Sequence, residues 1–97
     1  MDWLFINLKK KEMKRNEVYE VIDNERDYQE LNKSDDSSHI VEDFPLSSAL
    51  EAIRYNIGKA NEKWYIEQKP YPKAMEHIRK ISAICVQMGE KYNMPKR

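Results

Sequence analysis

Cysteine is almost absent from this sequence of 97 residues, with Cys85 as its one example. A single thiol cannot form an internal disulfide, a cysteine-built zinc site or a CxxC redox motif. Such a composition suits a reducing compartment, so we expect a cytoplasmic protein.

Glycine is scarce too, because Gly58 and Gly89 are its two examples and they stand alone. A glycine-rich loop that cradles phosphates is therefore excluded. Phosphate groups would have to be held by a helix amino terminus near Ser47 and Ser48 or by cationic side chains. The candidate cations are Arg26, Arg54, Lys59, Arg79 and Lys80.

The sequence also lacks net charge and long hydrophobic runs. Seventeen basic and seventeen acidic residues cancel, which removes the global field that attracts nucleic acid, so we expect no general nucleic-acid binding. The apolar residues 3–6 are too few to span a bilayer, and the basic residues 9–11 follow them, in the reverse order of a secretory signal. We expect no membrane partner.

The remaining composition indicates one small globular domain. Charged residues make up 35% and hydrophobic residues 40% of the chain. A chain of this length hides only about two thirds of its unfolded surface, and such small cores are often completed by oligomerisation. We expect a homo-oligomer of one helical domain, residues 13–97, preceded by a loosely attached lead, residues 1–12.

Three stretches have the periodicity of amphipathic helices and predict an all-α, three-helix antiparallel bundle. The first covers about residues 12–32, and the polar residues 33–43 after it predict a loop. The second begins near Pro45 or at Ser48, which has capping-box spacing to Glu51, and ends near residue 65. Pro70 and Pro72 separate it from the third, at about residues 73–92.

The third predicted helix has a low-polarity sector that is wider than one neighbouring helix needs. Its stripe consists of Ala74, Ile78, Ile81, Cys85, Met88 and Tyr92, so Cys85 is predicted to pack in the core. Met75, Ser82, Val86 and Gly89 widen the stripe on one side. We expect contacts on two sides, either from the two other helices or with a second subunit that packs closely at Ser82 and Gly89.

A charged residue faces inward on the first predicted helix. The apolar residues Val18, Val21, Ile22 and Tyr28 define its inward direction, and Glu25 and Gln29 fall near the middle of that sector. An inward carboxylate requires a partner. The candidates are Arg54, Asn61 and His77 at the edges of the other stripes. The group is either a structural polar network or a ligand pocket between helices.

An aromatic residue closes the second predicted helix. Trp64 and Tyr65 stand at its end, and Tyr71 follows in the next turn. A flat ring at the mouth of a pocket can stack on a nucleobase for roughly 1–3 kcal/mol. The alternative is that Trp64 caps the bundle core.

Four segments, taken in order, carry a family resemblance. Residues 24–29 read NERDYQ, His39 precedes the acidic pair Glu42 and Asp43, residues 60–64 have the pattern AxxxW, and residues 77–97 read HIRKISAICVQMGEKYNMPKR. These segments resemble small phage-encoded all-α proteins that are described as similar to the MazG nucleotide pyrophosphohydrolases. The similarity covers residues 18–97.

This resemblance implies an all-α bundle, oligomerisation, a nucleotide-shaped site and, for a phage protein, the cytoplasm of the host cell. It points to Glu25, Arg26, Gln29, His39, Trp64 and Arg79. With the inward-facing candidates added, the predicted ligand-binding residues are Glu25, Arg26, Gln29, His39, Arg54, Asn61, Trp64, His77 and Arg79.

The sequence departs from that family in its carboxylates. Cleavage of a nucleoside triphosphate needs Mg²⁺ held by several converging carboxylates, which MazG enzymes supply as an ExxE pair on one helix and an ExxD pair on the next. The second predicted helix offers Glu51 and Glu62, which point away from its apolar stripe, and the third offers Glu76 and Glu90 at spacings that match neither motif. We therefore expect no bound metal and no catalytic residue.

Three functions remain open on these grounds. We predict first a protein that binds a nucleotide or nucleotide-derived signal without turnover, which would keep the signal from a host defence. The first alternative is a divergent nucleoside triphosphate pyrophosphohydrolase with Glu25, Glu42 and Asp43 around Mg²⁺. The second is a helical protein–protein interaction module. A cofactor, Mg²⁺, is implied by the enzyme alternative alone.

Overall fold

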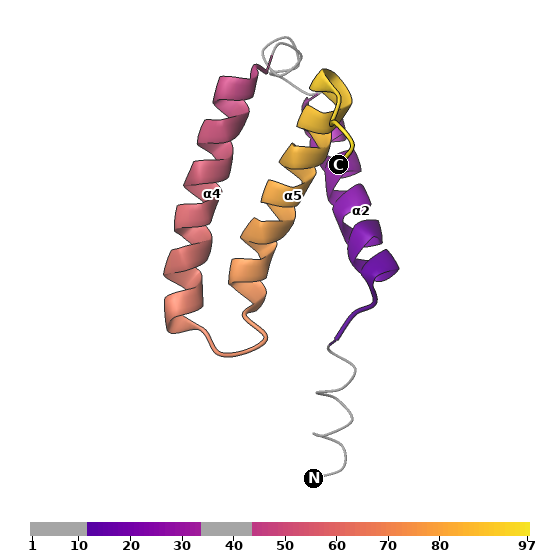
Figure 1. The fold of residues 1–97 in the computed structure, drawn as a ribbon. Coiled ribbons are helices and arrows are strands. Elements are labelled where there is room, and N and C mark those ends of the chain that lie inside the picture. Colours follow the sequence, from indigo (N-terminus) through magenta and orange to yellow (C-terminus); the bar gives the residue numbers. More distant parts are fainter. Residues whose placement is uncertain (1–11, 34–43) are drawn as a thin grey trace.

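The computed structural model describes residues 12–33 and 44–97. These residues form three helices and no strand (Figure 1), namely α2 (Arg15–Lys33), α4 (Leu46–Ile66) and α5 (Pro72–Tyr92). The predicted all-α three-helix bundle is confirmed, and each helix begins and ends within three residues of its predicted bounds. Residues 1–11 of the predicted lead and most of the predicted loop, with His39, lie outside the described residues.

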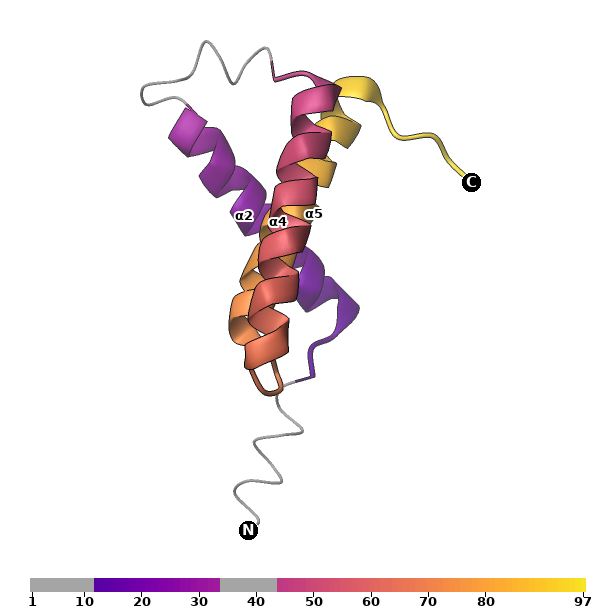
Figure 2. The same cartoon turned by 90° about the vertical axis from the view of Figure 1, so that its left-hand side faces the viewer.

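Helix α5 lies between the other two helices (Figure 1). Helices α4 and α5 run antiparallel as a hairpin, while α2 crosses α5 obliquely (Figure 2). Over the described part of the chain, α2 and α4 each pack on α5 and not on each other. The expectation that α5 is contacted on two sides is confirmed, and both contacts come from its own chain.

The turn between α4 and α5 is built from prolines and a capping carboxylate. Helix α4 ends at Ile66, and α5 begins at Pro72, the first-turn position that tolerates proline. The side chain of Glu67 reaches forward and accepts hydrogen bonds from the backbone N–H groups of Lys73 (2.8 Å) and Ala74 (2.9 Å). These N–H groups have no partner within their own helix, so Glu67 acts as the amino-terminal cap of α5.

The start of α4 differs from the predicted capping box. The helix begins at Leu46 directly after Pro45, and no side chain caps it. Ser48 lies inside the first turn of the helix, so it does not stand at the cap position, which Pro45 occupies. The backbone of Pro45 is extended, with φ −81° and ψ 165°, and it sets the entry to the helix without a capping side chain.

The buried core is small and lies mostly between α4 and α5. The buried apolar residues are Ala49, Ala74, Ala83, Ile84 and Met88. Among the described residues no large side chain is fully buried. Three alanines among the five allow the helix backbones to approach closely but supply little apolar volume.

The prediction that Cys85 packs in the core is wrong, because Cys85 is exposed. Ile84 and Met88 hold the buried α5 positions beside α4, and the side of the predicted stripe that carries Cys85 stays open. Gly89 is approached by the chain's own Met94, whose Cε would lie 3.1 Å from a Cβ at that position. Within the described residues, no helix has an apolar stretch long enough to cross a membrane.

Replacing Glu67 with alanine removes both acceptors at the start of α5. We expect the free energy of unfolding to fall by about 1–2 kcal/mol, as for other lost helix caps and charge-assisted hydrogen bonds. Urea denaturation followed by circular dichroism measures the change. Glu67→Gln keeps one acceptor oxygen and should lose less, whereas an unchanged urea midpoint for Glu67→Ala would contradict the cap.

Candidate functional site

The charge predicted to face inward is buried at the contact between α2 and α5. Glu25 is 9% exposed, and its Oε1 accepts a hydrogen bond of 2.7 Å from Nε of Arg79 on α5. A charge-assisted pair of this length offsets part of the cost of removing the carboxylate from water. The inward position of Glu25 is confirmed, and its partner is Arg79.

The three partners proposed for Glu25 from the sequence are therefore corrected. Arg54 and Asn61 lie exposed on α4, which does not reach α2. The guanidinium of Arg54 instead lies 3.7 Å from Glu51 of its own helix. His77 faces α4, where its Nδ1 forms a hydrogen bond of 2.9 Å with Oδ1 of Asn56.

Two more predicted residues extend the polar contact along α2. Arg26 forms ion pairs with Glu30 (2.7 Å) and with Glu90 of α5 (2.8 Å). Burial lowers the pKa of Arg26, but hydrogen bonds to Glu90 and Glu30 and their negative charges outweigh burial and raise it above its usual value. The guanidinium is therefore charged at any physiological pH. Gln29 donates to the carbonyl oxygen of Lys80 at 3.5 Å, which is a long contact.

An open depression of about 600 Å³ lies beside the Glu25–Arg79 pair. Besides the pair, its lining includes Asn24 and Tyr28 from α2 and Lys80 from α5. Tyr28 is 59% exposed, although the sequence pattern placed it in the inward stripe. Because Arg79 neutralises Glu25, Lys80 leaves the lining with a net positive charge. Such a surface suits a flat, anionic ligand.

The aromatic end of α4 faces a different groove. Trp64 and Asn61 line a cavity of about 340 Å³ between α4 and α5, together with Tyr71 from the turn. Most of its other lining residues are aliphatic, among them Ile57, Ile78 and Ile81. The ring of Trp64 stands edge-on to Tyr65, with 6.3 Å between the centroids and 75° between the planes. The Glu25–Arg79 pair lies where α5 meets α2, in a depression whose lining shares no residue with this groove.

The structure therefore divides the predicted site among separate places. Glu25, Arg26, Gln29 and Arg79 meet where α2 contacts α5, while Asn61 and Trp64 line the apolar groove between α4 and α5. His77 is bonded within the hairpin, Arg54 lies on its outer surface, and His39 lies outside the described residues. Glu42 and Asp43 lie outside them too, and the described residues contain no group of three potential metal ligands.

Replacing Arg79 with methionine leaves Glu25 buried without its partner. We expect a loss of about 1–3 kcal/mol in the free energy of unfolding, moderated because the Arg79 side chain is 38% exposed. The double variant Glu25→Leu, Arg79→Met should recover most of that loss, since it removes both charges together. Arg54→Met, at a side chain 79% exposed, is the control and should change stability by less than about 0.5 kcal/mol.

Equal losses in the single and double variants would contradict the pairing. Thermal and urea denaturation of the wild type, Glu25→Leu, Arg79→Met and the double variant measure the pairwise term as a double-mutant cycle, with Arg54→Met as the separate control.

Comparison with models of known families, with curated proteins and with solved structures gives no match. The function is therefore inferred from the geometry of the chain itself.

Proposed function

We propose that this protein is a helical interaction module whose α4–α5 hairpin binds another protein helix. The observation that carries the proposal is an exposed apolar residue at every seventh position along both helices of the hairpin. These residues are Leu50, Ile57 and Trp64 on α4, and Ile78, Cys85 and Tyr92 on α5. We call this set the open seam.

Seven-residue spacing has a specific structural meaning in a helix. Residues seven apart lie two turns apart on nearly the same face, which is the pattern that helices use to pack along their length. Apart from Cys85, the open-seam side chains are between 42 and 56% exposed. Ile57, Trp64 and Ile78 line one groove, so α4 and α5 present their open seams to the same side. Contiguous apolar surface of this kind is typical of protein interaction sites.

A second set of apolar residues, also spaced by seven on each helix, is already covered within the hairpin. Ala74 and Met88 are buried, and Ile53, Ala60 and Ile81 are half-buried. These residues therefore pack α4 against α5. The open seam is the other set of apolar residues on each helix, and it is left for a partner. The expected cytoplasmic location is part of this proposal.

Trp64 offers a direct test, because it stands in the groove where the partner helix would bind. In a Trp3→Phe background, Trp64 is the one remaining tryptophan. We expect its emission to shift to shorter wavelength and its quenching by acrylamide to fall when amphipathic helical peptides with seven-residue apolar spacing are added. Ile57→Lys should abolish the shift, and Ile66→Lys, outside the seam and 77% exposed, should retain it. Unchanged emission with every peptide, at a concentration where the protein is monomeric, would contradict the proposal.

A second candidate function, binding of a nucleotide or nucleotide-derived signal without turnover, is favoured by the depression beside Glu25 and Arg79. Tyr28 offers an exposed ring for a base, and Lys80 offers an ammonium group for a phosphate. With the family resemblance, this candidate is a phage protein that keeps such a signal from a host defence. Arg26 and Gln29 join α2 to α5 at the same contact, so they would hold the residues that line the depression in place.

Isothermal titration against mononucleotides and cyclic dinucleotides, with and without Mg²⁺, tests this second candidate. We expect Lys80→Met to weaken binding by about tenfold or more, the usual effect of losing one charge-assisted contact. Lys69→Met, in the turn after α4, is the matched control. No heat with any nucleotide would reject the candidate, and mass spectrometry that shows Mg²⁺-dependent release of pyrophosphate would favour the pyrophosphohydrolase alternative instead.

A further inference from the structure

We infer that the occupant of the open seam is a second copy of this chain, and that two α4–α5 hairpins pair about a two-fold axis into a four-helix bundle. This inference rests on the proposed interaction function and names its partner. A two-fold interface uses the same surface on both copies, so the seam must be complementary to itself.

The heptad layers of the hairpin meet that requirement. A four-helix bundle needs two apolar layers on every helix, one toward each neighbour. On α4 and on α5, the first layer packs against the other helix of the same hairpin. The second layer, the open seam, carries no charged residue on either helix. Two identical hairpins placed seam to seam therefore supply each other's missing layer.

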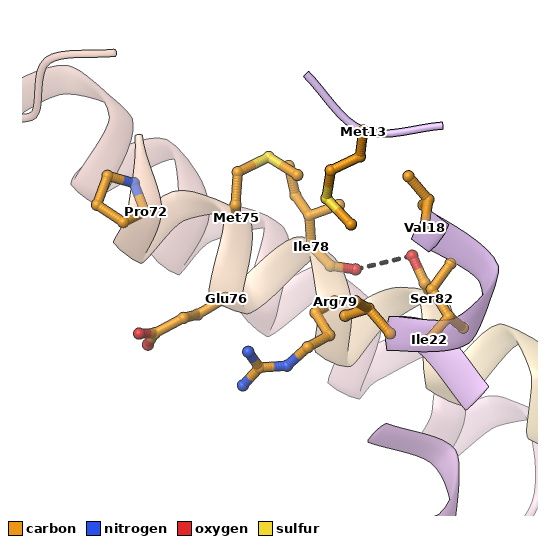
Figure 3. Close-up of a pocket in the computed structure, with 10 residues that line it drawn as sticks. Met13, Val18, Ile22, Pro72, Met75, Glu76, Ile78, Arg79 and Ser82 are labelled. Atoms are coloured by element: carbon orange, nitrogen blue, oxygen red, sulfur yellow. Dashed lines mark hydrogen bonds between the residues drawn. The ribbon is translucent and has the colours of Figure 1, made fainter. Parts of the chain in front are cut away.

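The shape of the surface, a ridge between two grooves, also suits this pairing. Met75 and Ile78 of α5 lie between two grooves, because each residue lines both the α4–α5 groove and a second groove of about 230 Å³ beside α2. Figure 3 shows Met75 and Ile78 with Met13 and Val18 around this second groove, while the carboxylate of Glu76 and the guanidinium of Arg79 point away from Met75. A ridge between grooves is the shape by which helices interdigitate.

The small buried core of one chain favours a second copy as the occupant of the open seam. Among the described residues no large side chain is fully buried, and the buried apolar set consists of three alanines, one isoleucine and one methionine. Covering the half-exposed seams of two copies would bury apolar area on the order of 1,000 Å², which is the lower limit for a specific interface. Pairing would thus complete the core that one chain lacks.

Cys85 reports on this interface directly. As the single cysteine it gives an unambiguous thiol signal, and it is exposed in one chain but lies in the layer that pairing would cover. For the full chain, sedimentation should give a mass of two chains at high micromolar concentration. Reaction of Cys85 with a thiol reagent should be slow there and become fast on dilution, as the dimer dissociates.

Two isoleucine variants provide a matched comparison. Ile57→Lys introduces two ammonium groups into one apolar interface by symmetry, so we expect dimerisation to weaken by more than about a hundredfold. Ile66→Lys makes the same change at the end of α4, at a residue 77% exposed and outside the seam, and should remain dimeric. Should Ile57→Lys fail to fold, the wild-type melting temperature decides, since it must rise with protein concentration if the dimer forms.

A monomer with a reactive Cys85 at every concentration overturns the inference. A monomer with a protected Cys85 overturns it as well, because another part of the same chain would then cover the seam. If the protein is monomeric and Trp64 still responds to helical peptides, the interaction function stands with a different partner. If neither self-association nor peptide binding is observed, both proposals fail.

Discussion

Every tertiary contact between helices in the described structure passes through α5. Because α2 and α4 pack on opposite sides of it and not on each other, the residues of this one helix must satisfy two different neighbours. Toward α4 it presents Ile84, Met88 and small residues, and toward α2 it presents Arg79 and Glu90. Ile78 of the open seam lies between these two contacts, because it lines a groove on each side.

The two contacts of α5 are held by different forces. The hairpin with α4 is held by apolar packing and by the cap that Glu67 supplies to the start of α5. The contact with α2 depends on the Glu25–Arg79 pair and on Arg26, which joins α2 to Glu90. Ion pairs that are removed from water add more to geometric specificity than to net stability. The α4–α5 hairpin therefore contains the buried apolar cluster, and the ion pairs help to orient α2 on α5.

The two proposed functions occupy different surfaces of this arrangement. The open seam lies on the hairpin, whereas Tyr28 and Lys80 stand where α2 meets α5. A partner helix and a small anionic ligand would therefore bind without competing for the same side chains. The lining of the depression takes Asn24 and Tyr28 from α2, so it exists only where the polar contacts hold α2 in place.

The sequence by itself determined the three helices, their ends and the inward position of Glu25, because helical periodicity and prolines act over a few neighbouring residues. It also identified the apolar stripes of α4 and α5. Only the tertiary structure decided which half of each stripe is covered, since that depends on where the neighbouring helix lies; hence Cys85 was placed in the core and is exposed. The partner of Glu25 was likewise decided by the separation of α2 from α4, which brings Arg79 to the carboxylate and leaves Arg54 in solvent.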